Sequence, residues 1–442
     1  MGIYNALFTG ASGLTAFGEG VRVIGDNIAN VNTLGFKSQN VNFSDVLGQT
    51  VNVSRSNIAN QVGNGVRIGA ITRDQSQGSV QSTTSASDMA INGTGLFVLK
   101  DPASGQTFYT RAGSFILDSE SNLINGQGFN VQGWALDSSG NAVGSVTDIA
   151  LSNLAASAQA TTTVDVGINL DATSPLPAVT PFDPTDPSTY TYKSDVTTYD
   201  SLGGVHVVSI MFVKTAADTW DWHAAVDAAE LTPTVPPAAP GTLTEIGTGG
   251  SLSFDPASGA LDVETSPTIT GINWASAAAG SIDFNFGDAV TTDAQGTTGN
   301  GTNGSLQLAG ANGTRFMTAD GFASGFLDHL ETDSTGRIFG VFTNGQRRAI
   351  FQVALAKFPN EAVLSKEGGS MMAETIASGT PVLEKPGNAG MGSISPFALE
   401  QSNVDLANEF VKLIVIQRGY EANSKTILTT DQMLSALMTL KR

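Results

Sequence analysis

Residues 399–434 read LEQSNVDLANEFVKLIVIQRGYEANSKTILTTDQML, and apolar side chains recur there every seven positions. The main line consists of Leu399, Leu406, Leu413, Tyr420, Ile427 and Leu434. A second line, offset by three or four residues, contains Phe410, Ile416 and Leu437. Two such lines are typical of a helix whose apolar seam is covered by a partner helix. The C-terminal end is therefore predicted to be a heptad helix.

The N-terminal end has a matching pattern. One line consists of Leu7, Leu14, Val21 and Ile28, and the other of Ile3, Phe17, Ile24 and Val31. We therefore expect the two ends to pair as a coiled-coil-like stem, with two nested, mainly β domains inserted between them.

An apolar stripe is usually intramolecular core, so a seam between copies of the chain needs further support. Five glycines interrupt the N-terminal helix: Gly10, Gly13, Gly18, Gly20 and Gly25. Each interior glycine costs up to ~1 kcal/mol of helix stability. Such a helix should order mainly when neighbours enclose it, and small residues let backbones approach closely. The sequence thus favours an assembly subunit whose seam residues pack against other copies.

Charge is concentrated in the middle of the chain. The net charge is −19, and residues 151–320 hold 18 acidic residues against three basic ones, a balance of −15. An acidic surface disfavours binding to nucleic acid. The chain has no cysteine, which excludes disulfides and thiolate sites. No apolar run approaches the ~20 residues of a membrane span, and we expect neither a membrane anchor nor a cleaved signal peptide.

Turn signals and composition suggest an α+β multidomain architecture. Asn-Gly pairs at 92–93, 125–126 and 344–345 flank apolar segments and predict hairpins. Proline-rich residues 175–187 and a Gly/Thr/Asn tract at 287–314 frame the acidic module as an insertion. We predict four parts: a helical inner domain (1–30 plus 397–442), an extended connector (31–75 plus 372–396), a β domain (76–150 plus 320–371) and an inserted acidic outer β domain (151–319).

No catalytic motif is evident. The chain contains no phosphate-binding loop, nucleophile turn or H-E-x-x-H zinc motif, and His206, His223 and His329 are scattered. Residues 218–223 (DTWDWH) combine carboxylates with two indoles, as sugar-binding grooves do. On a strand, however, Asp221 and His223 point away from both indoles, which favours a half-buried strand. We predict no enzyme activity, no cofactor and no metal site.

Residues 27–37 read NIANVNTLGFK, residues 399–405 read LEQSNVD and residues 417–423 read QRGYEAN. These three segments, near the two ends of the chain, resemble signatures of the axial proteins of the bacterial flagellum, the family of rod and hook subunits. Asp26 and Leu34 occupy positions that vary in that family. The predicted signature residues are Asn27, Asn30, Thr33, Gly35, Phe36, Lys37, Ser402, Asn403, Val404, Asp405, Gln417, Arg418, Gly419, Tyr420, Ala422 and Asn423.

Further segments bear on the branch of the family. Residues 88–98 (DMAINGTGLFV) and 109–115 (YTRAGSF) are similar to segments that rod and hook subunits share. Residues 200–203 (DSLG) and 212–214 (FVK) are similar to a hook segment, and rod relatives generally lack a large inserted domain. The resemblance therefore favours the hook branch.

The resemblance implies a structural subunit that polymerises into a curved, flexible tube, a universal joint passing torque from rod to filament in motility. It also implies terminal helices that line the inner tube and β domains that form outer layers. The implied partners are further copies of the chain, rod proteins, the hook cap, hook–filament junction proteins and the flagellar type III export apparatus. The implied location is the flagellum outside the cell, reached without a cleaved signal peptide.

Two alternatives remain. A distal rod subunit would form a straight, rigid assembly. A surface adhesin or sugar-binding exoprotein would place its function in the acidic module and bind a ligand near Trp220 and Trp222.

Overall fold

The computed structural model describes residues 2–53, 59–152, 154–232, 239–265, 268–293, 296 and 298–439. Outside the described residues lie 1 and 440–442 of the predicted helical domain, 54–58 of the predicted connector, and 153, 233–238, 266–267, 294, 295 and 297 of the predicted outer domain. The side chains of Ile3 and Leu437 also lie outside them. Within the described part of the chain, no helix is both long and apolar enough to cross a membrane.

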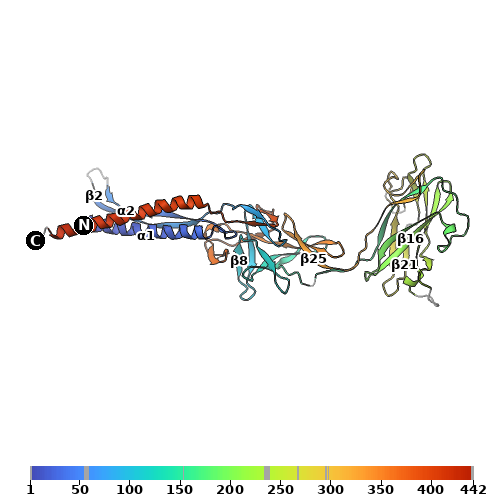
Figure 1. Ribbon diagram of the computed structural model, residues 1–442, viewed down its shortest axis with the longest axis horizontal. Coiled ribbons are helices and arrows are strands. Elements are labelled where there is room, and N and C mark those ends of the chain that lie inside the picture. The colour runs from blue at the N-terminus through green and yellow to red at the C-terminus, as the bar shows by residue number, and fades with distance from the viewer. Residues whose placement is uncertain are drawn as a thin grey trace. The chain divides into compact units, whose positions relative to one another are not determined.

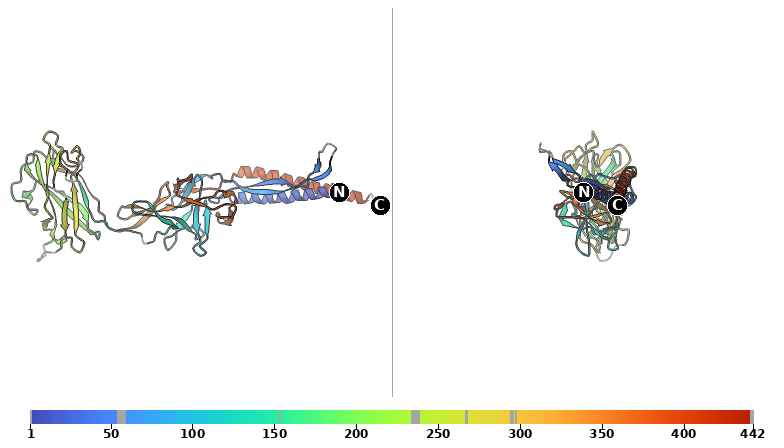
Figure 2. Two further views of the ribbon diagram at one scale, coloured as in Figure 1. Left: turned by 180° about the vertical axis from the view of Figure 1, so that it is seen from behind. Right: turned by 90° about the vertical axis from the view of Figure 1, so that its left-hand side faces the viewer.

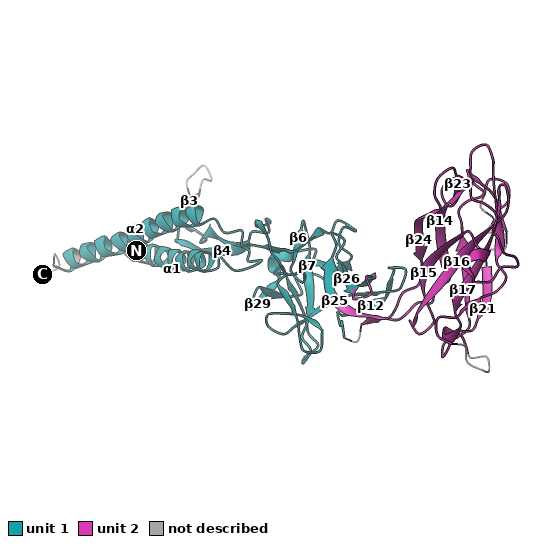
Figure 3. Ribbon diagram, turned by 45° about the vertical axis from the view of Figure 1, so that its right-hand side comes forward, with its two compact units in different colours: residues 1–153, 329–341, 347–442 teal, residues 154–328, 342–346 magenta. Residues whose placement is uncertain are grey.

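The chain divides into two compact units, coloured separately in Figure 3. Unit 1 contains residues 1–153, 329–341 and 347–442, and unit 2 contains residues 154–328 and 342–346. Unit 2 therefore interrupts the sequence of unit 1. The finer division into four parts stays a prediction.

Two helices lie at the ends of the chain, α1 (Gly2–Ala29) and α2 (Leu406–Thr439). They run side by side in opposite directions (Figures 1 and 2). Asp405 caps the start of α2, because its Oδ1 accepts hydrogen bonds from the backbone N–H groups of Ala407 (2.9 Å) and Asn408 (3.4 Å). α1 ends in a polar turn that leads to Gly35, whose φ of +64° favours glycine.

The heptad pattern extends past the helices at two positions, where the prediction of helix is wrong. Val31 lies in the turn after α1. Leu399 lies in β33 (Ala398–Glu400), which pairs with β5 (Val80–Ser82). Residues 398–400 are extended because their backbone forms hydrogen bonds with β5. The helix begins only after Asp405, which caps it.

Unit 1 contains a β-ribbon beside the helices and a larger sheet. The ribbon consists of β1 (Gln39–Asp45) and β4 (Val66–Arg73), paired antiparallel, with β2 (Gln49–Val53) and β3 (Ala59–Val62) between them in sequence. It packs on α1, where the rings of Phe17 and Phe43 have centroids 5.4 Å apart.

The larger sheet of unit 1 has the strand order β26-β27-β11-β7-β8-β30-β29, with β12, β9–β10, β28 and β31 joined at its side. β6 pairs with β32. The bounds are β6 (Met89–Asn92), β7 (Leu96–Lys100), β8 (Thr107–Thr110), β9 (Phe115–Leu117), β10 (Leu123–Asn125), β11 (Asn130–Leu136), β12 (Ala142–Asp148), β26 (Arg337–Phe342), β27 (Arg347–Val353), β28 (Leu355–Lys357), β29 (Ser365–Gly368), β30 (Met371–Ala373), β31 (Val382–Glu384) and β32 (Ser393–Pro396).

Each of the three Asn-Gly pairs predicted a hairpin, and two of these predictions are confirmed. β10 pairs with β11, and β26 pairs with β27, so the pairs at 125–126 and 344–345 join hairpin strands, as predicted. The hairpin expected at 92–93 is wrong, because β6 pairs with β32 while β7 pairs with β8, β11 and β28. Gly93 still turns the chain with a φ of +110°.

Unit 2 is a pair of sheets. One has the order β21-β22-β14-β23, with β24 also on β14, and the other has the order β15-β16-β17-β19-β20, with β18 on β17. The bounds are β13 (Ala155–Ala156), β14 (Thr163–Asp171), β15 (Tyr192–Tyr199), β16 (Val205–Ala216), β17 (Thr219–Asp227), β18 (Leu243–Glu245), β19 (Gly250–Phe254), β20 (Leu261–Glu264), β21 (Thr268–Ile272), β22 (Gly280–Asn285), β23 (Leu306–Leu308), β24 (Gly313–Ala319) and β25 (Gly325–Thr332), the last of which continues into unit 1.

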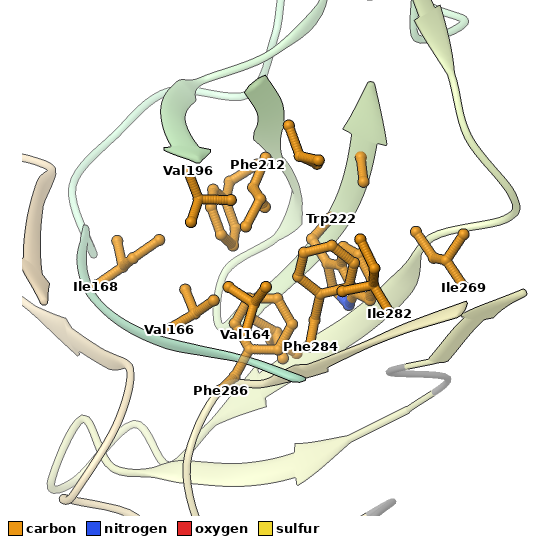
Figure 4. Close-up of a cluster of buried hydrophobic side chains, with 14 of the residues drawn as sticks. Val164, Val166, Ile168, Val196, Phe212, Trp222, Ile269, Ile282, Phe284 and Phe286 are labelled. Carbon is orange, nitrogen blue, oxygen red and sulfur yellow. The ribbon is translucent and has the colours of Figure 1, made fainter. Parts of the chain in front are cut away.

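The core of unit 2 lies between these sheets. Figure 4 shows Val164, Val166 and Ile168 of β14 facing Phe212 and Trp222 of the opposite sheet. Trp220 and Trp222 are both fully buried, which confirms that the two indoles share one face of β17.

One buried residue of this core is a carboxyl group. Glu264 of β20 has no exposed surface, and its Oε1 accepts a long hydrogen bond (3.4 Å) from the backbone N–H of Phe286. Its Oε2 finds no hydrogen-bond partner among the described residues. Burial, reinforced by the nearby Asp293 and Asp283, raises the pKa of Glu264 to about 8. The protonated, neutral form of Glu264 therefore predominates at pH 7.

We expect the stability of unit 2 to fall as pH rises. The unfolded chain releases the Glu264 proton near the ordinary pKa of 4.5, whereas the folded chain holds it until about pH 8. The free energy of unfolding therefore decreases as the pH rises between these two values. Each tenfold difference in proton affinity between the folded and the unfolded chain contributes about 1.4 kcal/mol. Glu264→Gln should remove this part of the dependence, giving a gain of a few kcal/mol over the parent at pH 8.5 and little at pH 4.5. Urea unfolding followed by tryptophan fluorescence measures this, and an equal pH slope in both proteins would contradict it.

Candidate assembly site

The face of α1 that meets α2 contains several glycines. Gly10, Gly13 and Gly20 are buried there. A Cβ added at Gly13 would lie 2.6 Å from Oδ1 of Asn423, and one at Gly10 would lie 2.9 Å from Cγ1 of Ile427. These distances are shorter than side chains tolerate, so the missing side chains allow the two backbones to approach.

Large side chains fill the spaces that the glycines leave. Ile416 of α2 lies over Gly20, where an added Cβ would be 2.9 Å from Cδ1 of Ile416. α2 presents its own glycine, Gly419, to the ring of Phe17, with an added Cβ 2.9 Å from Cζ. Each helix therefore supplies both large and small residues to the contact.

A buried polar contact fixes the end of the helix pair nearest the strands. Asn27 is fully buried, and its Nδ2 donates to Oε2 of Glu409 at 3.0 Å. The same amide exchanges two hydrogen bonds with the backbone of Gln39, at 2.8 and 2.9 Å. Glu409 also accepts from Nζ of Lys412 at 2.7 Å. A buried polar pair of this kind penalises any shift in the alignment of the helices.

The predicted seam residues fall into three groups. Phe17, Ile416 and Ile427 contact glycines of the other helix, and Ile24 is buried. Half-buried are Leu7, Leu14, Val21, Ile28, Leu413 and Leu434. Exposed are Leu406 (40%), Phe410 (50%) and Tyr420 (44%). Their role in contacts between copies stays a prediction.

The second predicted set, the signature residues, gathers where the helices meet the strands. We call this region the joint, and its centre is Glu400 of β33. One carboxylate oxygen of Glu400 lies 2.6 Å from Nζ of Lys37, and the other lies 2.6 Å from Nε of Arg111. The backbone N–H of Gly78 donates to the same carboxylate at 3.0 Å. All three charged side chains are more than nine-tenths buried.

Burial and the attraction between opposite charges have opposing effects on the pKa values of Glu400 and Lys37. Burial alone would raise the pKa of Glu400, but the charge of Arg111 and the hydrogen bonds from Arg111 and Lys37 hold that pKa below its ordinary value. The pKa of Lys37 is lowered, chiefly by burial, which the attraction of Glu400 offsets only in part. Removing one charge of such a buried pair is strongly destabilising, because the other charge stays buried without an opposite charge beside it.

Asn403 completes the joint. Its Oδ1 accepts from the backbone N–H of Ser38 at 2.7 Å, and its Nδ2 donates to the backbone oxygens of Asp74 and Ser76, both at 3.1 Å. Gly35 donates its backbone N–H to the carbonyl of Glu400 at 2.9 Å, and an added Cβ would lie 2.6 Å from the backbone nitrogen of Ala112. Only glycine fits there.

The structure separates the remaining signature residues. Asn30 and Thr33 bond to each other in the turn after α1, and Phe36 is buried beside them. Ser402, Val404 and Asp405 lie in the segment just before α2, and Asp405 caps the helix. Gly419 and Asn423 lie in the helix contact, while Gln417, Arg418, Tyr420 and Ala422 are exposed on α2.

Sequence reasoning missed the partners at the centre of the joint. Glu400 and Arg111 both lie in segments that resemble the flagellar family, but nothing in the sequence pairs them. No sequence signal indicated this pairing, because residues 398–400 were predicted as part of the helical end and not as a strand with a buried carboxylate. The glycines of α1 were interpreted as allowing close packing of helices, but the sequence did not show that they form the contact with α2.

The sugar-binding alternative finds no support in unit 2. Both indoles at 220 and 222 are fully buried, and Nε1 of Trp220 donates to Gln307 at 2.9 Å. His223 stacks on Phe182 with ring centroids 4.0 Å apart. Within the described ranges, no group of three or more His, Asp or Glu side chains could hold a metal ion.

Four family models match the chain. Residues 7–37 match the flagella basal body rod protein model, and residues 396–440 match the C-terminal model of the flagellar basal body rod FlgEFG proteins. Residues 90–173 match the flagellar hook protein FlgE/F/G D1 domain, and residues 169–322 match the flagellar basal body protein FlaE D2 domain.

Curated relatives match over nearly their full length. The flagellar hook protein FlgE of Borreliella burgdorferi is 34% identical, with 99% of each chain covered. FlgE of Salmonella typhimurium is also 34% identical, covering 97% of this chain and 98% of that protein. The crystal structure of Helicobacter pylori hook protein FlgE2 is 14% identical and covers 73% of this chain and 100% of that chain, with a TM-score of 0.48.

We expect inner and outer glycines of α1 to respond oppositely to alanine. Gly13→Ala places a methyl group against Asn423 and should separate the helices, whereas Gly18→Ala meets no atom within 4 Å and should stabilise α1 by about 0.5–1 kcal/mol. Circular dichroism during thermal unfolding measures both. Equal effects of the two substitutions would contradict the assigned contact face.

We expect Glu400→Gln to destabilise unit 1 by about 3–5 kcal/mol near neutral pH, because Lys37 and Arg111 would remain buried without a negative partner. The pKa of Glu400 is held low, so its contribution is present above the ordinary value of 4.5 and is lost as pH falls through the lower folded value. The parent's advantage over the variant should therefore shrink in acid. Hydrogen exchange at residues 34–38 in urea measures the effect. Glu421→Gln, at an exposed position of α2, is the matched control and should change nothing.

Proposed function

The chain belongs to the flagellar hook protein family, and on that premise we propose that its terminal helices build the wall of the hook from copies of this chain. Membership places the chain in the bacterial flagellum as a structural subunit of the hook that assembles with itself. The family is structural, in line with the expectation that the chain is not an enzyme.

One observation supports this use of the helices. α2 packs on α1, and apolar side chains of α2 beside this contact remain exposed. Phe410 is 50% exposed, Val411 61%, Ile414 51% and Val415 62%. A contiguous apolar patch of this kind on a monomer marks a contact surface. In a homopolymer, the surface available to cover it is another copy of the stem.

The proposal extends to finer features of the assembly. The antiparallel helices act as a coiled-coil-like stem in the inner layer of a curved tube, and the β parts form layers around it. Bending requires stiff bodies joined by short segments, and the connector regions 31–75 and 372–396 are our candidates for these segments. The remaining proposed partners are rod proteins, the hook cap, hook–filament junction proteins and the type III export apparatus, with export occurring without a cleaved signal peptide.

The distal rod is the second candidate, because both ends of the chain match models named for basal body rod proteins. The match of residues 169–322 to the FlaE D2 domain and the full-length FlgE relatives favour the hook. A straight polymer would favour the rod, and a curved one the hook.

We expect Phe410→Asp combined with Val415→Asp to abolish polymerisation while leaving the monomer folded. Both side chains are at least half exposed, so two carboxylates there stay hydrated in the monomer but must be desolvated when copies pack. Concentrated protein in ammonium sulfate, which strengthens apolar burial, is imaged by electron microscopy.

Ser424→Asp combined with Thr429→Asp is the matched control, because it adds the same charge at exposed polar positions of α2. This control should form the same tubes as the parent. Normal tubes from the Phe410/Val415 variant would refute the proposed contact surface.

A further inference from the structure

A buried histidine of unit 2 lies between two carboxylates. His206 lies near the start of β16, and its side chain is only 9% exposed. Its Nδ1 lies 2.8 Å from Oε2 of Glu230, and its Nε2 lies 3.2 Å from Oδ2 of Asp200. Glu230 ends the short helix η2 (Ala228–Glu230), and Asp200 belongs to the turn at 200–204 between β15 and β16. The imidazole therefore joins η2, this turn and β16.

Both contacts require a hydrogen on the imidazole. A neutral imidazole has one N–H and one lone pair, whereas an imidazolium donates from both nitrogens. A lone pair that faces a carboxylate oxygen at 2.8 or 3.2 Å is repelled by it, so only the imidazolium satisfies both carboxylates. The indole of Trp274 stacks on the imidazole, with ring centroids 3.9 Å apart and planes 15° from parallel. The face of an indole attracts a cation, so this contact also favours the charged form.

The other polar groups nearby are turned to different partners or carry no charge. Asp227, next to η2, accepts hydrogen bonds from the backbone N–H groups of Ala229 at 3.0 Å and Gly241 at 2.8 Å. On the strand side, the residue opposite His206 is Thr198 of β15. Within the described residues, the ionisable groups in contact with the imidazole are therefore the two carboxylates.

The two carboxylates differ in how well they tolerate loss of the imidazole proton. Glu230 is 33% exposed, so water can replace the imidazole there. Asp200 is only 7% exposed, and its Oδ1 accepts from the backbone N–H groups of Leu202 and Gly204, both at 2.8 Å. Burial opposes the negative charge of Asp200, but the bonds from Gly204, His206 and Leu202 hold its pKa below the ordinary value. An imidazole with a single proton therefore keeps it on Nε2, where Asp200 would otherwise stay buried without this donor.

We propose that His206 is a proton-operated clamp: the imidazolium ties η2 to the turn at 200–204, and loss of one proton releases Glu230 while Asp200 stays bound. The clamp lies within one chain, so it does not depend on the proposed self-assembly.

Release of Glu230 affects one end of unit 2. The backbone N–H of Ala275 donates to the carbonyl oxygen of Glu230 at 2.8 Å, so the segment before β22 is held through the same residue. The turn at 200–204 packs on segments close to where the chain enters and leaves unit 2. A Cβ added at Gly203 would lie 2.8 Å from Cβ of Ala158 and 3.2 Å from the backbone nitrogen of Ser324. The clamp thus controls local order beside these two segments.

The test follows the full chain from about pH 5.5 to about pH 9, a range that brackets the ordinary imidazole pKa of about 6.5. Histidine-selective ¹⁵N NMR should show protons on both ring nitrogens of His206 at the acidic end and on Nε2 alone at the alkaline end. The chain has three histidines, and the signals that His206→Phe removes identify this one. Over the same titration, hydrogen-exchange protection of the Ala275 amide should fall at least about tenfold, the size expected for one charged hydrogen bond.

Glu230→Gln should abolish this fall, because a side-chain amide can donate to the unprotonated Nδ1 and satisfy the neutral imidazole. Glu245→Gln is the matched control, because Glu245 makes the same kind of contact with Nδ1 of His223 at 2.6 Å. This control should keep the parent's response. Glu264 titrates in all of these proteins, so only the differences between them report on the clamp.

Three results would overturn the clamp. The first is a single proton that stays on Nδ1 of His206 at the alkaline end. The second is an Ala275 amide whose protection does not follow the titration of His206 in the parent. The third is a fall in protection in Glu230→Gln as large as that in the parent.

Discussion

The buried carboxylate of Glu400 holds together parts of the chain that are far apart in sequence. Its two partners, Lys37 and Arg111, lie 363 and 289 residues away. Through them, the strand that precedes α2 is tied to the turn that follows α1 and to the main sheet of unit 1. Because a buried charge is tolerated only with its partners in place, the helices and the sheet cannot separate without exposing or stranding a charge. The attachment of the helices to the sheets of unit 1 depends on this constraint.

The helices depend on each other in a different way. α1 is interrupted by glycines and has little helix propensity of its own, so its order depends on packing against α2. Ile416, Phe17 and Ile427 each lie over a glycine of the opposite helix. The contact with α1 leaves other apolar side chains of α2 exposed, including Phe410 and Ile414. The same packing that completes the stem thus creates the surface available for assembly.

Much of this could be predicted from the sequence. The terminal helices, the burial of Trp220 and Trp222 on one face of a strand, and the flagellar family all followed from periodicity and motif. The heptad pattern failed at Val31 and Leu399, because periodicity records side-chain character and not where a cap or a strand partner ends the helix. It also could not identify the glycine line as the contact face, since hydrophobic patterns ignore residues without side chains. The pairing of Glu400 with Arg111 depends on the tertiary fold alone.

The position of the helix contacts in the sequence has a kinetic consequence. The hydrogen bond between Asn27 and Glu409 spans 382 residues, so the stem is made almost wholly of non-local contacts. Contacts of this kind form slowly, because chain entropy must be lost before they stabilise anything. The sheets of unit 1 bring the two ends near each other and thereby reduce that loss. The stem should therefore be the last part of the chain to form, and a subunit should acquire its polymerising surface only after the rest of it has folded.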